Sequence, residues 1–229
     1  EATLRQVFYW PRMRRQCEHY TASCHECQLF KKKRRKYGHL PIKQAETIPW
    51  QRVNVDLVGP YKVKTPTREY ELRAMTMIDP ATGWFEIAPI REPDSNNTNK
   101  AFDSYWLARY PRPMECGFDN GNEFKGLFKQ LCENYGLKRK PSTEYNPQSN
   151  AIVERVHQVL GNMLRTFELE ERELDKNEPF KEFLTATAYA IRSTYHTTLQ
   201  ATPGQLIFGR DMILPLKFQA DWARIAQRK

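Results

Sequence analysis

The chain has 229 residues, 36 of them Lys or Arg and 27 Asp or Glu, for a formal net charge of +9. This length allows one sizeable core, and five cysteines are an odd number that argues against a secreted disulfide framework. We find no signal peptide and no apolar run long enough to cross a bilayer, so we expect no membrane partner.

The first 49 residues separate into a helical part and a basic part. We predict helix over residues 1–30, with a break at Pro11, and a proline-containing linker over residues 31–49. Residues 1–40 carry ten Lys or Arg against three Glu, so most of the net charge lies here. The basic run consists of Lys31, Lys32, Lys33, Arg34, Arg35 and Lys36. It would attract DNA phosphates and could serve in nuclear import, or it could be a solvated linker.

The remaining residues alternate between strand and helix patterns. We predict strands near residues 52–58, 69–79 and 83–90, a helix over about 96–109 with Asp94, Ser95 and Asn96 as candidate caps, and a short strand leading into Asp119. A helix over about 122–135 and a last strand over 137–141 follow. A long helix from about Asn150 to Leu169 precedes an acidic solvated stretch and helices near 179–195 and 202–208. This order predicts an α/β fold.

Three carboxylates stand at positions suited to one site. Asp56 lies in V-N-V-D-L-V-G-P, a strand pattern that ends at Gly-Pro, and Asp119 opens the turn D-N-G-N-E-F. Glu154 lies near the start of the long helix, away from its apolar stripe. Two strand ends and a helix start can bring three carboxylates together, where they could bind two magnesium ions for phosphoryl chemistry on a nucleic acid.

Several strings in this order resemble the integrases of gypsy-type LTR retrotransposons. P-W-Q-R-V-N-V-D-L-V-G-P, F-D-N-G-N-E-F and Y-N-P-Q-S-N-A-I-V-E-R resemble the catalytic core. L-R-Q-V-F-Y-W-P-R-M-R with C-H-E-C-Q is similar to the C-terminal half of the family's zinc-binding domain, and T-P-G-Q-L-I-F-G-R to the segment after the core. The resemblance spans nearly the whole chain.

The resemblance implies a ribonuclease H-like core, with a mixed five-stranded sheet flanked by helices. It assigns Asp56, Asp119 and Glu154 as ligands of two Mg²⁺ (or Mn²⁺) ions in 3′-end processing and strand transfer of element DNA into target DNA. It implies a homo-oligomer on DNA, located in the nucleus after passage through cytoplasmic particles. The expected domains are residues 1–30 (zinc-binding half), 31–49 (linker), 50–209 (catalytic core) and 210–229 (start of a C-terminal extension).

The chain departs from the family pattern at several positions. Between Asp119 and Glu154 there are 34 residues, one fewer than usual, and Phe118 stands where Ser or Thr is common. Cys24 and Cys27 have the spacing of two zinc thiolates, but the family's paired histidines would lie upstream of Glu1. We therefore expect a fragment that begins inside the zinc domain, with Zn²⁺ bound by the intact parent. Alternatively, the two cysteines are reduced thiols in a helical hairpin.

The loop before Glu154 is the expected DNA contact. By resemblance, Gln148 and Asn150 approach the DNA end, with Arg155 beside them. Asn150 is equally suited to cap the helix. Two other functions stay open: a domesticated or degraded DNA-binding protein without catalysis, and a ribonuclease H or related nuclease. Loss of a triad residue would indicate the former and a fourth carboxylate the latter.

Overall fold

The computed structural model describes residues 4–25, 46–64, 69–119, 121–141, 151–169 and 180–229, without the side chains of residues 64, 151–155 and 166–169. Among these residues, no helix combines the length and apolar character needed to span a membrane.

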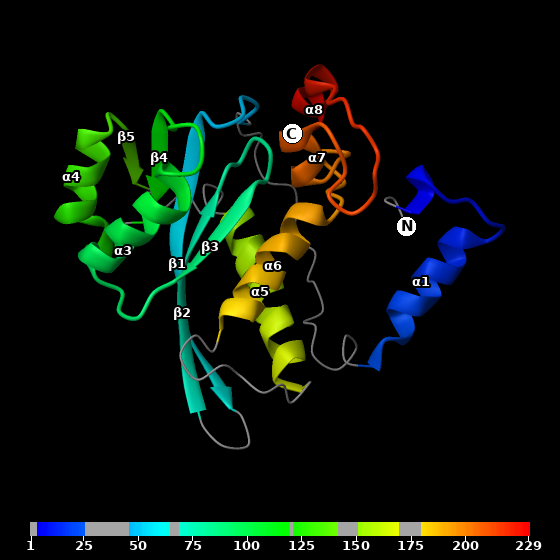
Figure 1. The fold of residues 1–229 in the computed structure, drawn as a ribbon, viewed down its shortest axis with the longest axis horizontal. Coiled ribbons are helices and arrows are strands. Elements are labelled where there is room, and N and C mark those ends of the chain that lie inside the picture. Colours follow the sequence, from blue (N-terminus) through cyan, green and yellow to red (C-terminus); the bar gives the residue numbers. More distant parts are fainter. Residues whose placement is uncertain (1–3, 26–45, 65–68, 120, 142–150, 170–179) are drawn as a thin grey trace.

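The centre of the molecule is a mixed five-stranded sheet (Figure 1). Its strands are β1 (Arg52–Lys64), β2 (Glu69–Ile78), β3 (Phe85–Pro89), β4 (Glu115–Phe118) and β5 (Lys138–Pro141), in the spatial order β3-β2-β1-β4-β5. The pairs β1–β2 and β2–β3 are antiparallel, whereas β1–β4 and β4–β5 are parallel. The predicted mixed sheet is confirmed, and its central strand is the one that carries Asp56.

Strand β1 is longer than the sequence pattern predicted. The Gly-Pro pair at 59–60 was expected to end it, but pairing with β2 resumes at Tyr61 after a change of register and continues to Lys64. The expected stop at Gly59 is therefore wrong. An irregularity in an antiparallel pair can accommodate residues that lack a ladder hydrogen bond, so the proline interrupts the pairing without ending the strand.

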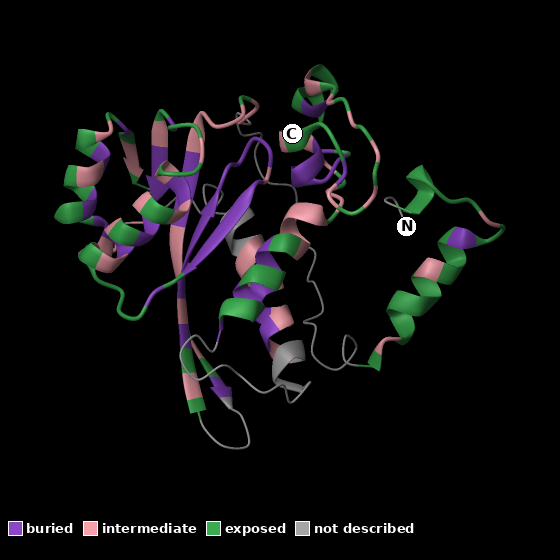
Figure 2. Cartoon of the chain, in the orientation of Figure 1, coloured by how far each residue is buried: buried purple, intermediate pink, exposed green. Residues whose placement is uncertain are grey.

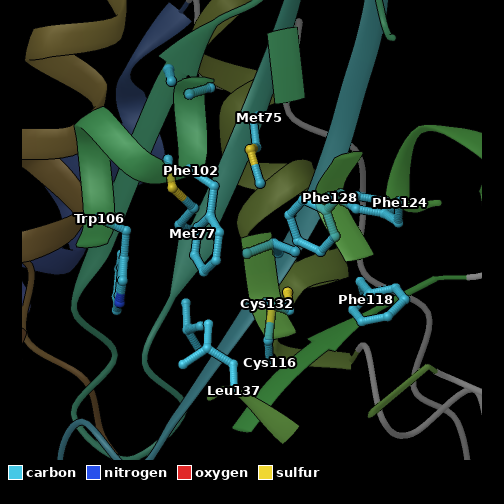
Figure 3. Close-up of a cluster of buried hydrophobic side chains, with 14 of the residues drawn as sticks. Met75, Met77, Phe102, Trp106, Cys116, Phe118, Phe124, Phe128, Cys132 and Leu137 are labelled. Atoms are coloured by element: carbon cyan, nitrogen blue, oxygen red, sulfur yellow. The ribbon is translucent and has the colours of Figure 1, made fainter. Parts of the chain in front are cut away.

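Helices cover both faces of the sheet and make two separate cores. On one face, α3 (Ser95–Phe102), the π-helical η2 (Asp103–Leu107) and α4 (Leu127–Asn134) contribute aromatic side chains that pack on Val53, Val55, Met75 and Met77. Figure 3 shows this cluster, in which the rings of Phe118, Phe124 and Phe128 lie next to one another with centroids 5.1–5.6 Å apart.

On the opposite face, α5 (Ala151–Leu169) and α6 (Lys181–Ser193) pack against the sheet. Leu160 and Leu164 of α5 share a buried cluster with Val58 and Ala74. Because side chains alternate along a strand, Asp56 and Thr76 lie on this same face as Val58 and Ala74. The alternation therefore turns the first candidate carboxylate toward helix α5.

The predicted helices are present with shifted bounds. Of the three candidate caps, Asp94 caps α3, accepting a hydrogen bond from the backbone N–H of Asn97 at 2.7 Å. The helix predicted over 122–135 is instead a 3-10 turn, η3 (Asn122–Phe124), followed by α4. Gly126 separates them with a φ of +56°, a conformation incompatible with a continuous helix.

The terminal parts differ in how closely they pack. Figure 2 shows that α1 (Met13–Ser23) is mostly exposed, and Met13 is its buried residue. It follows the short η1 (Leu4–Gln6). At the other end, α7 (Pro203–Phe208) begins with a capping box at Thr202. Helix α8 (Trp222–Arg228) was not predicted from the sequence, and it buries Ile225.

Candidate active site

Asp56 lies near the middle of β1, opposite Thr76 of β2. Its side chain is 19% exposed, and Oδ1 accepts a hydrogen bond from the backbone N–H of Leu57 at 2.8 Å. Thr76 is buried, and its hydroxyl donates to the backbone carbonyl of Asp56 at 3.2 Å. The carboxylate is thus held on the central strand while part of it stays accessible.

The parallel pairing of β1 and β4 brings the segment that carries Asp119 alongside the segment that carries Asp56. In that register Asn54 pairs with Gly117, and each aspartate follows its member of the pair by two residues. A Cβ placed on Gly117 would lie 2.4 Å from Oδ1 of Asn54, so both positions face the same side of the sheet. Asp56, two residues further along β1, extends from that side because side chains alternate along a strand, and Asp119 lies one residue past the end of β4.

Asp119 itself begins the turn that follows β4. Its side chain is half-buried, and Oδ1 accepts a hydrogen bond from the backbone N–H of Gly121 at 3.1 Å. A carboxylate that bonds to the backbone two residues ahead holds such a turn in place. The prediction that a strand-end turn carries Asp119 is confirmed.

Helix α5 approaches the same place through His157. The imidazole Nε2 lies 2.9 Å from the Thr76 hydroxyl, and Nδ1 lies 3.9 Å from Oδ2 of Asp56. Burial lowers the pKa of His157 to about 4, so the ring is neutral at pH 7. Glu154 precedes His157 by three residues in this helix, although its side chain lies outside the described residues. Backbone positions three residues apart are on one side of an α-helix.

The donor chemistry of this place suits a hard divalent cation. Two half-buried carboxylates, Asp56 on β1 and Asp119 in the turn after β4, offer the oxygen ligands that Mg²⁺ prefers. Among the side chains that the structure describes, no three His, Cys, Asp or Glu residues converge in a way that would complete a metal site. The residues therefore fit part of a magnesium site, and Glu154 is the candidate for the missing ligand.

Several other predicted site residues lie outside the described part of the chain. These are Cys27, Gln148, Asn150 and the basic run from Lys31 to Lys36. Arg155 lies in α5, but its side chain is also outside the described residues. Cys24 is half-buried at the C-terminal end of α1. The zinc and DNA contacts of these residues stay predictions.

His157 and Thr76 were not identified from the sequence. Thr76 appears there as an ordinary strand residue, and His157 as one polar residue in an amphipathic helix. The available signal was the spacing of His157 from Glu154, which places both positions on one side of the helix. Their contact joins residues 81 apart in the chain, and sequence spacing does not indicate that Thr76 is the partner.

The chain is similar in sequence to several known proteins. A family model described as the integrase zinc-binding domain matches residues 1–33. The Pro-Pol polyprotein of feline foamy virus is 24% identical over 226 residues, which cover 96% of this chain and 18% of that protein. The retrovirus-related Pol polyprotein from transposon 412 of Drosophila melanogaster is 27% identical over 218 residues, covering 95% and 17%. The chain thus spans less than a fifth of these relatives.

Solved structures establish the fold. A chain of the simian T-cell lymphotropic virus intasome in complex with PP2A regulatory subunit B56 gamma matches with a TM-score of 0.61 and 19% identity, over 90% of this chain and 70% of that one. The magnesium-bound HTLV-2 integrase catalytic core domain, in its dimeric form, matches with a TM-score of 0.53 and 18% identity, over 69% and 96%. The expected ribonuclease H-like fold, in the form found in integrase cores, is confirmed.

Proposed function

We propose that this chain is the integrase portion of the Pol polyprotein of a gypsy-type LTR retrotransposon. It would process the 3′ ends of element DNA and join them to target DNA. The observation that carries the proposal is that Asp56 on β1 and Asp119 just after the paired β4 belong to adjacent segments of an integrase-like sheet, with the helix that carries Glu154 packed against Asp56. The resemblance of nearly the whole chain to retroelement Pol polyproteins supports it.

In this proposal the protein contributes position and charge to the reaction. Asp56, Asp119 and Glu154 would hold two Mg²⁺ (or Mn²⁺) ions. When bound, such ions activate the attacking oxygen and stabilise the leaving oxygen of an in-line displacement. The sheet supplies rigidity, because Asp56 lies on its central strand and Asp119 at the end of the adjacent strand. Water attacks in end processing, and the freed 3′ hydroxyl attacks in strand transfer.

The remaining parts of the chain would bind the substrate and assemble the complex. We assign Lys31–Lys36, Gln148, Asn150 and Arg155 to DNA contact, and Cys24 and Cys27 to a zinc ion in the full-length protein. Neutralising phosphates with lysine and arginine makes binding depend on salt. We further propose a homo-oligomer on DNA and a nuclear site of action after assembly in cytoplasmic particles.

The test is strand joining by the full-length protein that contains this chain. With Mg²⁺ or Mn²⁺ and short duplexes bearing the element's ends, wild-type protein should join the ends to target DNA. Glu154→Gln keeps the size of the side chain but removes its charge, so joining should fall by at least about 100-fold while DNA binding persists. The matched control is Glu182→Gln, the same change at an exposed residue of α6, which should leave joining unchanged.

A second arm separates substrate binding from catalysis. Neutralising the basic run to glutamine should weaken DNA binding and reduce the slope of its salt dependence by about one for each phosphate that the protein no longer neutralises. A protein that binds DNA but never joins strands, with or without Glu154, would contradict the proposal. That result would instead favour a degraded or domesticated DNA-binding protein.

A further inference from the structure

We infer that His157 is a positioning residue, which fixes helix α5 against the β1–β2 pair and thereby sets the place of Glu154 relative to Asp56. This inference rests on the proposed function, because it concerns the geometry of the same metal-binding carboxylates. It adds a residue that touches none of the reacting atoms. The evidence is a short chain of contacts that joins three elements of the fold.

The contacts converge on the Thr76 hydroxyl. His157 of α5 meets this oxygen through Nε2 at 2.9 Å, and the same hydroxyl lies 3.2 Å from the backbone carbonyl of Asp56. Thr76 is 2% exposed and the His157 side chain 18%, so water competes little for these bonds. The helix is therefore attached to the sheet at the level of the first candidate metal ligand.

The single proton of the hydroxyl determines how the ring is oriented. A threonine hydroxyl donates one hydrogen bond and accepts others. With the hydroxyl proton donated to the Asp56 carbonyl, Thr76 accepts from His157, and the inference therefore includes a ring proton on Nε2. The Nδ1 atom then faces Oδ2 of Asp56 at 3.9 Å, too far for a hydrogen bond. The ring thus lies beside the carboxylate and restricts its movement without bonding to it.

The hydrogen bond between His157 and Thr76 is placed where it can affect the position of Glu154. Residue 154 lies one turn before His157, so a movement of the helix at His157 moves the backbone of Glu154 as well. Mg²⁺ requires near-ideal octahedral geometry at about 2.0–2.1 Å from its ligands. A displacement of about 1 Å in a catalytic group can lower a rate by about 100-fold. A bond that fixes α5 against β2 is therefore expected to affect metal binding more than overall stability.

The experiment measures Mn²⁺ binding to the full-length protein without DNA, by calorimetry and by the electron paramagnetic resonance of the ion. The disrupting variants are His157→Ala and Thr76→Val, which remove opposite sides of one hydrogen bond. Each should weaken Mn²⁺ binding by about 10-fold or more, as removal of a residue supporting metal ligands commonly does. The double variant should be no weaker than the poorer single variant, because both changes remove the same hydrogen bond.

Conservative variants distinguish the proposed bond from general packing. His157→Gln can place an amide N–H where Nε2 lies, whereas the shorter amide of His157→Asn cannot reach Thr76. Gln should therefore retain Mn²⁺ binding within about threefold of wild type, and Asn should resemble Ala. Thr76→Ser keeps the hydroxyl and should also retain binding. The control is Gln130→Ala, which changes an exposed residue of α4 on the opposite face of the sheet and should leave Mn²⁺ binding unchanged.

Three results with the variants would overturn the inference. These are wild-type Mn²⁺ binding by both His157→Ala and Thr76→Val, additive losses in the double variant, or equal binding by the Gln and Asn variants. The nitrogen chemical shifts of the wild-type imidazole give a test that needs no variant: a proton on Nδ1 instead of Nε2 would also overturn it. Because none of these measurements requires strand joining, absence of joining would reject the proposed function and leave this inference standing.

Discussion

The contact between Gly117 and Asn54 offers a sharp test of how closely β1 and β4 must approach. Each residue precedes a candidate metal ligand by two positions, and the two are paired in the sheet. A Cβ on Gly117 would lie 2.4 Å from Oδ1 of Asn54 and 2.9 Å from Nη2 of Arg52. These distances are too short for real atoms, so Gly117→Ala must displace one of the two side chains.

The size of the effect follows from what has to move. Asn54 is 4% exposed, and its Oδ1 accepts a hydrogen bond from Nε of Arg52 at 2.9 Å. Overpacking a core position costs about 1–3 kcal/mol, and removal of a hydrogen bond costs about 0.5–1.5 kcal/mol. Gly117→Ala should therefore lower the free energy of unfolding by about 2–4 kcal/mol. For a domain of this size, that corresponds to a fall in Tm of roughly 5–15 °C.

The assay is urea unfolding followed by circular dichroism, with Gly161→Ala as the matched control. A Cβ on Gly161, inside α5, would meet its nearest neighbour, Nη1 of Arg165, at 3.7 Å, which is an ordinary contact. Alanine is preferred over glycine within a helix, so this variant should gain about 0.5–1 kcal/mol. The same substitution thus has opposite signs at the two sites.

Ordinary surface substitutions change the free energy of unfolding by less than about 0.5 kcal/mol. A change that small in Gly117→Ala would refute the steric explanation. A second variant tests the cause. In Asn54→Ala/Gly117→Ala the obstructing amide is gone, so the part of the overpacking cost that Asn54 causes should be relieved. The close contact with Nη2 of Arg52 and the cost of the missing hydrogen bond remain. If the double variant loses more free energy of unfolding than the two single variants together, a contact other than that with Asn54 limits the approach.

Two further predictions concern buried charges. Arg192 contacts Oε2 of Glu86 at 2.5 Å and donates to the Phe85 carbonyl at 2.6 Å. Arg192→Met leaves the buried Glu86 without its cation, so it should lower the free energy of unfolding, measured in urea, by about 3–5 kcal/mol. A decrease below about 1 kcal/mol would contradict this. Burial lowers the pKa of Lys229 to about 8 from 10.5, so between these values the unfolded chain binds a proton that the folded protein lacks, and stability should rise with pH. The difference in stability between wild type and Lys229→Met should therefore grow in favour of wild type from pH 8 to about 10.5, and a difference that is independent of pH would reject this assignment.

Much of the fold and the candidate site could be predicted because the relevant signals are local. Alternating apolar residues around Asp56 indicated a strand, and the polar turn after Phe118 indicated where β4 ends. The apolar stripe of residues 150–169 indicated a helix long enough to carry Glu154. Each signal depends on neighbours within a few residues, so it is contained in the sequence itself.

Tertiary structure decided what these local signals leave open. Whether Gly59 and Pro60 end β1 depends on β2, which continues to offer a partner strand beyond them. The segments that carry Asp56 and Asp119 lie side by side because of a parallel register between residues some sixty positions apart in the chain. The contact of His157 with Thr76 joins residues 81 apart. Local propensity determines which helices and strands form. The strand register, and the face of the sheet on which each side chain lies, are set by the packing of all these elements together. A register shift of one residue would turn every side chain of a strand to the other face.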